Sequence, residues 1–275
     1  MKYFSKIYIF IILGILYIPI ITLIFFSFNS SSSTALFEGF SFKWYVELFR
    51  SPAAFEALRN TLILAASSAV IATVIGTAAA EGIYKMRNKL ANTAITSVTN
   101  IPMMNPDIVT GMSMMLFFVA VAGILGISYE NVGFVAMLIS HVTFCLPYVI
   151  LSVLPRITEL GDSLSEAALD LGCTPIRSFF KVKLPNIMPG VITGMIMAFT
   201  MSLDDFVISY FVGSSDFQTL PLLIYSMTKK QVKPDMYALS SIIIISVFTL
   251  LLISNVRSFK KTAPEHAKKR KGATK

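Results

Sequence analysis

Long apolar runs dominate the sequence. The first, IYIFIILGILYIPIITLIFFSF at 7–28, contains no charged residue and exceeds the roughly 20 residues that cross a hydrocarbon core. It is also longer than the core of a secretory signal peptide, which has about 7–15 apolar residues, so we predict a retained span. The runs are continuous rather than alternating, which favours helices over membrane strands. Five more runs lie at 61–84, 91–125, 132–154, 187–212 and 237–255.

The composition agrees with an all-α, polytopic membrane protein of six transmembrane helices. The chain of 275 residues is 55% hydrophobic and only 14% charged, and its mean hydropathy is +0.72. A soluble domain has close to a quarter of its residues charged. We expect one transmembrane domain over 1–258 and a basic, disordered cytoplasmic tail over 259–275.

The third run, 91–125, is too long for one straight membrane helix. It contains NIPMMNPDIV, in which Pro102 and Pro106 each remove a helical hydrogen bond. We expect one helix that ends near residue 101 and a second that starts at Pro106, with Asn105 as its cap. Broken helices at membrane depth are tolerated where protein or a water-filled cavity covers them, so this break points to a pathway.

The basic residues define the orientation. With the N-terminus inside, seventeen of the 23 Lys and Arg residues fall in inner segments and six in outer ones. Positive charge collects on the cytoplasmic side, so we expect an inner-membrane protein with both termini in the cytoplasm. The net charge of +8 lies mostly in the tail and beside spans, where anionic lipid explains it. We therefore expect no nucleic-acid partner.

The outer segment 29–60 contains FKWYVELF, which resembles a short helix lying on the outer membrane interface. Trp44 and Tyr45 would be its interfacial anchors, because such rings prefer the headgroup level. The same surface could instead contact a partner outside the membrane.

Several kinds of chemistry are missing from the sequence. It has no G-x-x-x-x-G-K-[ST] phosphate loop, no H-E-x-x-H motif and no nucleophile–base pattern, so we expect a non-enzyme without cofactor or metal in this chain. Cys145 and Cys173 form no recognisable framework. His141 lies inside the fourth run, where an ionisable group is either functional or simply hydrogen-bonded to a neighbouring helix.

A polar, basic stretch interrupts the apolar runs between the fourth and fifth spans. SLSE at 163–166 fits a capping box, with Ser163 as the cap and Glu166 at the third position. Gly172 is well placed to end this first short helix, because the residue after a helix often has a positive φ.

A second short helix follows in the same stretch. Thr174 is placed to cap it and Pro175 to take its first position. Pro185 is expected to end it. The stretch is thus predicted to be two short helices that face the cytoplasm, and such helices need packing partners because they are marginal alone.

This stretch resembles the coupling loop of ABC-importer permeases, whose signature is E-A-A-x3-G-x9-I-x-L-P. Val182 stands in place of the signature isoleucine and keeps its apolar character. The resemblance implies that the loop, at 155–189, docks into a separate ATPase subunit; Glu166 could serve this contact, the capping box, or both. The matching residues are Glu166, Ala167, Ala168, Gly172, Val182, Leu184 and Pro185.

Two adjacent acids, Asp204 and Asp205, lie in the fifth run. Neighbouring helix positions point about 100° apart, so one structural partner would not serve both. They could line a path for a cation, or pair with a neighbouring subunit. Asp107, beside the third-span break, could add another acid to this path or be favoured there by the helix dipole.

Other segments narrow the resemblance. YIPI, SFNSS, NPDIV, SHVTFCLPYV, MSLDDFVISYFV and LPLLIYSM are similar to the second permease subunit of spermidine/putrescine importers, from the first span to the sixth. A polyamine is a linear polycation, for which carboxylates and aromatic faces are suitable partners. The candidate aromatic residues are Phe206, Tyr210 and Tyr225.

The resemblance implies the type I ABC importer permease fold and a larger assembly. This chain would form the path with a sibling permease in the lipid bilayer. Two ATPase subunits would bind ATP and Mg²⁺, and an extracytoplasmic polyamine-binding protein would dock on 29–60 and 213–236. The alternatives are an ABC permease for another small solute, and a secondary transporter or membrane enzyme that needs no ATPase.

Overall fold

The computed structural model describes residues 2–31, 36–129, 133–214 and 217–228, with isolated helical positions between 237 and 249. Within these described residues every regular element is a helix, apart from one isolated β-bridge. The all-α prediction is confirmed. The chain divides into two compact units, one of Met1–Pro52 with Ser226–Lys275 and one of Ala53–Tyr225.

The first five predicted spans each correspond to a helix that is long and apolar enough to cross a membrane. The sixth predicted span, 237–255, lies largely outside the described residues, as does the predicted tail at 259–275. The five helical runs are Ile7–Phe26, Pro52–Lys85, Asp107–Leu125, Gly133–Leu160 and Pro175–Asp204.

The first unit contains α1 (Lys2–Phe26) and the short α2 (Lys43–Arg50). The short helix predicted in 29–60 is therefore confirmed. Between the two helices, Asn29 and Phe40 form the β-bridge. Trp44 is only 8% exposed, and its indole N–H donates to the Asn29 carbonyl oxygen at 2.7 Å. The ring thus secures the outer segment itself and is not the interfacial anchor that the sequence suggested.

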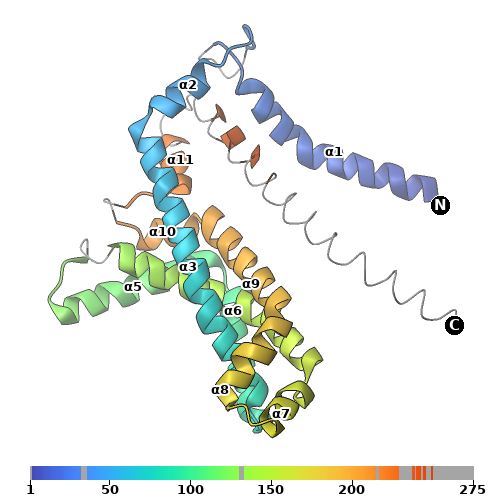
Figure 1. Ribbon diagram of the computed structural model, residues 1–275. Helices are drawn as coiled ribbons and strands as arrows, with labels where there is room; N and C mark the ends of the chain where they lie inside the picture. The colour runs from blue at the N-terminus through green and yellow to red at the C-terminus, as the bar shows by residue number, and fades with distance from the viewer. Residues whose placement is uncertain are drawn as a thin grey trace. The chain divides into compact units, whose positions relative to one another are not determined.

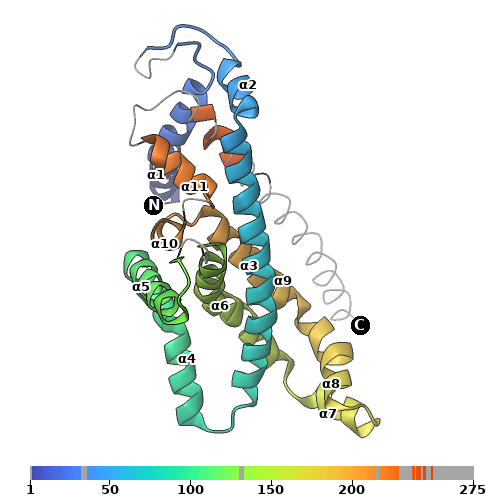
Figure 2. The same ribbon diagram turned by 90° about the vertical axis from the view of Figure 1, so that its left-hand side faces the viewer.

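The second unit is built around three long helices that lie side by side, α3 (Pro52–Lys85), α6 (Gly133–Leu160) and α9 (Leu184–Asp204) (Figures 1 and 2). Their contacts use small side chains, as is usual between membrane helices. A Cβ on Gly190 would lie 2.8 Å from the Ser152 carbonyl oxygen of α6, so α6 and α9 are in backbone contact there. The stripe on α9 repeats every four residues: Gly190, Gly194, Ala198 and Ser202.

The predicted break in the third run is confirmed, with different capping. α4 (Lys89–Met104) and α5 (Asp107–Leu125) are separated by Asn105 and Pro106. Asn105 caps the end of α4, not the start of α5, and Pro106 is the residue before α5, not its first position. Pro102 does not break α4, because it lies in the last turn and costs only one backbone hydrogen bond.

The fifth predicted run is also interrupted, which the sequence did not indicate. α9 ends at Asp204, and a separate short helix, α10 (Val207–Val212), follows. α5 packs closely on α10, since a Cβ on Gly111 would lie 3.4 Å from the Ile208 Cα. α11 (Leu220–Thr228) then starts beside α3, where the Leu220 N–H donates to the Thr61 hydroxyl at 2.7 Å.

Candidate functional site

Two short helices, α7 (Ser163–Asp170) and α8 (Pro175–Ser178), occupy the predicted coupling stretch. Gly172 has φ 85°, and its N–H donates to the Leu169 carbonyl at 2.9 Å. The next N–H, of Cys173, donates to the Ala168 carbonyl at 3.0 Å. These two bonds form a Schellman motif, which confirms Gly172 as the residue that turns the chain.

The caps of the two helices agree only partly with the prediction. Asp162, not Ser163, precedes α7, and no side chain caps its first turn. The capping-box interpretation of Glu166 is therefore wrong, and its side chain is exposed. Thr174 does cap α8, because its hydroxyl accepts the Arg177 N–H at 3.4 Å.

Hydrogen bonds between two serines hold the two short helices together. The Ser165 and Ser178 hydroxyls lie 3.0 Å apart, and the Ser178 hydroxyl also donates to the Ser165 carbonyl at 3.3 Å. Ala168 is buried at this contact face, while Ala167 is exposed. The hairpin is thus held closed by its own groups and presents Glu166 and Ala167 outward.

The second short helix does not end at Pro185. A π-helical turn, η2 (Phe179–Lys183), joins α8 directly to α9, and Pro185 lies in the first turn of α9. Proline lacks an N–H and its ring clashes with the carbonyl four residues earlier, so a wider π turn accommodates it where an α-helix would kink. Residues Pro175–Asp204 therefore form one continuous helical run of 30 residues.

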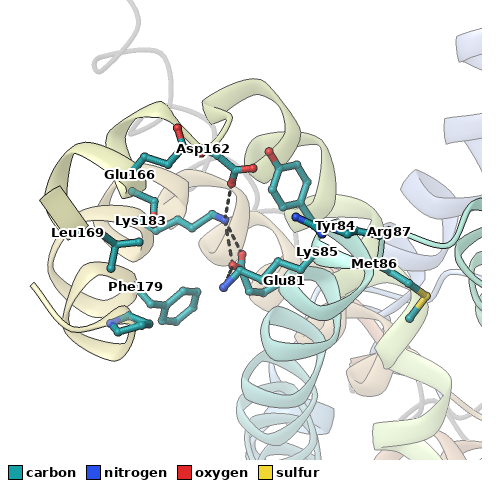
Figure 3. Close-up of a pocket in the computed structure, with 12 residues that line it drawn as sticks. Glu81, Tyr84, Lys85, Met86, Arg87, Asp162, Glu166, Leu169, Phe179 and Lys183 are labelled. Atoms are coloured by element: carbon teal, nitrogen blue, oxygen red, sulfur yellow. Dashed lines mark hydrogen bonds and ion pairs between the residues drawn. The ribbon is translucent and has the colours of Figure 1, made fainter.

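Lys183, the last residue of this π turn, is almost fully buried with a side chain 3% exposed. Its ammonium lies 2.9 Å from each carboxylate oxygen of Glu81 on α3 and 3.8 Å from the carboxylate of Asp162. It also lies 4.6 Å from the ring centroid of Tyr84. Figure 3 shows these groups converging on the ammonium from α3 and from the start of α7.

A cavity of about 400 Å³ opens beside this ion cluster. Its wall combines the end of α3 with both short helices, and it carries acids and bases in similar number, including Glu81, Glu166 and Arg87. Such a mixed lining suits a protein contact more than one charged ligand. Among the described residues no group of three His, Cys, Asp or Glu side chains could hold a metal ion.

The two adjacent acids differ in their surroundings. The Asp205 side chain is 6% exposed, and it accepts the backbone N–H groups of Ile208 at 3.3 Å and Ser209 at 2.9 Å. It therefore caps α10 and lies in the protein interior. Asp204, the last residue of α9, is exposed.

His141 completes a buried network at the same break. Its Nε2 lies 3.4 Å from the Asp205 carboxylate and 3.1 Å from the Ser209 hydroxyl. On the other side its Nδ1 lies 2.7 Å from the Ser202 hydroxyl, which in turn accepts from Ser68 of α3 at 2.9 Å. The hydrogen-bonded interpretation of His141 is confirmed, and its network joins α3, α6, α9 and α10.

The three predicted aromatic residues are brought together. The Phe206 ring centroid lies 5.5 Å from that of Tyr210 and 4.6 Å from that of Tyr225, and the two tyrosine rings are 5.5 Å apart. Asp107 is exposed at the start of α5. Within the described residues no hydrogen bond or ion pair joins it to Asp204.

The sequence did not indicate Glu81 and Lys183, or the serines around His141, as site residues. A signal for Glu81 was present, because it is an acid within the apolar second run, where an unpaired charge is costly. Its partner lies 102 residues away, and no local pattern connects them.

A family model described as binding-protein-dependent transport system inner membrane component matches residues 72–261. The putrescine transport system permease protein PotI of Escherichia coli (strain K12) is 39% identical over 229 residues, which cover 83% of this chain and 81% of PotI. The spermidine/putrescine transport system permease protein PotC of the same strain is 38% identical over 247 residues, or 90% of each chain.

A solved structure shares the fold. One chain of a bacterial ABC transporter involved in the import of the acidic polysaccharide alginate superimposes with a TM-score of 0.74, covering 94% of this chain and 95% of that one at 18% identity. This confirms the type I ABC importer permease fold. With a family model over most of its length and relatives aligned across most of the rest, the chain belongs to the family of inner-membrane components of binding-protein-dependent transport systems.

Proposed function

We propose that this chain is a permease subunit of an ATP-driven importer of polyamines such as putrescine and spermidine. Family membership supports the transport class, and the names of PotI and PotC support the cargo. The fold does not determine the cargo, since the structural relative belongs to an importer of an acidic polysaccharide. The charge of the cargo therefore has to be argued from the path residues of this chain.

The observation that carries the proposal is an exposed acid next to an aromatic cluster. Asp204 is exposed at the end of α9, and two residues later Phe206 starts the cluster with Tyr210 and Tyr225. A carboxylate attracts an ammonium group, and aromatic faces attract cations and cover the methylene chain between them. Asp107 would offer a second carboxylate along the path.

Asp205 has a different role in this proposal. Its carboxylate is occupied by two backbone N–H groups of α10 and faces His141. It therefore holds the α9–α10 break in place, so that Asp204 and Phe206 keep their positions beside the path. In this proposal Asp204 contacts the cargo, and Asp205 supports it by holding the helix break in place.

The ATPase contact is proposed for the hairpin of α7 and α8. Besides Glu166 and Ala167, this hairpin exposes apolar side chains that water alone would not favour. They occur on both short helices and on the π turn, and Gly172 sets the angle between the helices. The exposed apolar residues are Leu164, Leu169, Leu171, Ile176 and Phe180.

The remaining partners follow from this assignment. A sibling permease would complete the path, and two ATPase subunits would bind ATP and Mg²⁺ on the cytoplasmic side, where both termini lie. The polyamine-binding protein would dock on the outer segments 29–60 and 213–236. Part of the second outer segment, including 229–236, lies outside the described residues.

The test is polyamine uptake by the full complex in proteoliposomes, with and without ATP. We expect ATP-dependent uptake of labelled putrescine and spermidine. Asp204→Asn should lower it about fivefold, because losing one ammonium–carboxylate contact of about 1 kcal/mol has that effect. Asp204→Glu, which keeps the carboxylate, is the control and should keep most of the uptake.

Two results would count against the proposal. A wild-type complex that transports only a different solute would exclude polyamines as cargo. Unchanged uptake in Asp204→Asn would remove that carboxylate from the path while leaving the transport class intact.

A further inference from the structure

We infer that Glu81 and Lys183 are positioning residues that tie α3 to the helical run of the coupling hairpin, so that ATPase-driven movement of the hairpin also moves α3. The inference rests on the proposed coupling to an ATPase. It adds a second connection to the one that the continuous run Pro175–Asp204 already makes with α9.

The side chains of Glu81 and Lys183 are largely shielded from solvent. The Lys183 side chain is 3% exposed and that of Glu81 is 13% exposed. A buried charge is retained only when it is paired, and breaking such a pair leaves the other charge without compensation. Both Glu81 oxygens lie 2.9 Å from the ammonium, and Oε1 accepts a hydrogen bond from it, so the two charges are in direct contact.

The groups around the ammonium come from different elements. Glu81 lies one turn from the end of α3, Asp162 is the residue before α7, and Lys183 closes the π turn above α8. Glu81 of α3 thus meets Asp162 and Lys183, which stand at the two ends of the hairpin, next to the surface proposed to dock the ATPase (Figure 3).

A movement of the hairpin would reach α3 through Lys183. The hairpin is clasped by Ser165 and Ser178 and joined to α9 without a break, so it moves with the inner end of that helix. Lys183 lies at this end, and any displacement there pulls on Glu81. Helix displacements of one or two ångströms are typical of such interfaces.

The experiment measures the number of polyamine molecules taken up per ATP hydrolysed by the full complex in proteoliposomes. Lys183→Met keeps the length and apolar stem of the side chain and removes its charge. We expect the uptake-to-ATP ratio to fall at least tenfold while binding-protein-stimulated ATP hydrolysis remains. Glu81 still has a partner in this variant, because Lys85 lies 3.0 Å away and is 64% exposed.

Three further variants distinguish the loss of the connection between α3 and the hairpin from a general loss of protein stability. Lys183→Arg keeps a cation that can bind a carboxylate with two hydrogen bonds, and it should keep at least half of the wild-type ratio. The double variant Glu81→Lys with Lys183→Glu should have an uptake-to-ATP ratio at least threefold higher than that of either single variant. Its recovery is partial because the new acid faces Asp162. Thr22→Val, which removes a hydroxyl that donates to the Ile18 carbonyl within α1, lies outside the coupling loop and should change the ratio less than twofold.

A normal ratio in Lys183→Met would overturn the inference. If that variant does not assemble, Glu81→Gln decides, since it keeps the shape of the side chain and a normal ratio there would also overturn the inference. Failure of the proposed function is recognised separately, because the wild-type complex would then show no ATP-dependent polyamine uptake. In that case the same uptake-to-ATP ratio is measured with the solute that the wild-type complex does transport, and a normal ratio in Lys183→Met would overturn the inference.

Discussion

Two buried polar clusters lie in the second unit, and they are built differently. The first cluster joins Lys183 to Glu81 by full charges on long side chains. The second cluster joins His141 and Asp205 through short hydroxyls and the backbone N–H groups of α10. Long, charged side chains keep contact over small movements, whereas a network of short groups has one geometry. We therefore interpret the first as a linkage and the second as a fixed support.

The largest expected effect comes from breaking the fixed support. Asp205→Ala removes the acceptor of the Ile208 and Ser209 N–H groups and leaves His141 without its carboxylate. Each buried donor left without an acceptor costs about 1–3 kcal/mol, so the free energy of unfolding should fall by roughly 2–4 kcal/mol.

The measurement for Asp205→Ala is thermal unfolding of the purified complex in detergent, compared with Lys183→Met. We expect the Lys183→Met loss to be smaller, because Lys85 remains as a partner for Glu81. Equal losses in the two variants would contradict the distinction between support and linkage.

A middle effect is expected where α6 and α9 touch between the two clusters. Gly190→Val places side-chain atoms against the Ser152 carbonyl and the Arg156 side chain, which a Cβ alone would approach to 2.8 and 2.7 Å. Overpacking of this kind costs about 1–3 kcal/mol. Thermal unfolding should show this loss, with Gly82→Ala as the control because its surroundings are open. If both variants unfold at the wild-type temperature, the small-residue stripe does not set the helix separation.

The smallest effect on stability is expected in the hairpin. Gly172→Val forces a β-branched residue to φ 85°, which costs about 1–2 kcal/mol, and no neighbour lies within 4 Å to add a clash. The complex should keep its unfolding temperature within a few degrees, yet uptake should fall severalfold because the two docking helices change their angle. Gly126→Val, at φ 66° in another loop, is the matched control and should keep normal uptake.

The sequence predicted what depends on local patterns. The length of the apolar runs predicted five of the spans. The turn at Gly172 was predicted from its place after a short helix. The Thr174 cap was predicted from the proline that follows it. The wrong predictions have local causes too. Pro185 was expected to end a helix, but a π turn absorbs its missing N–H, and no residue pattern distinguishes the two outcomes.

The candidate site was predictable only in part. Asp204 and the three aromatic residues were identified by type, and the structure shows that Phe206, Tyr210 and Tyr225 meet. That Asp205 turns inward could not be predicted, because it depends on a helix break and on a histidine 64 positions earlier in the chain. The same holds for Lys183, whose burial requires Glu81 from another helix.

The unbroken helix from Pro175 to Asp204 also has a mechanical consequence. At about 1.5 Å per residue its 30 residues make a lever about 45 Å long. If it pivots about its middle, a tilt of about 5° moves each end by roughly 2 Å, in opposite directions. Two ångströms is enough to make or break a hydrogen bond. A small push at the Pro175 end is therefore sufficient to change the surroundings of Asp204 at the other end.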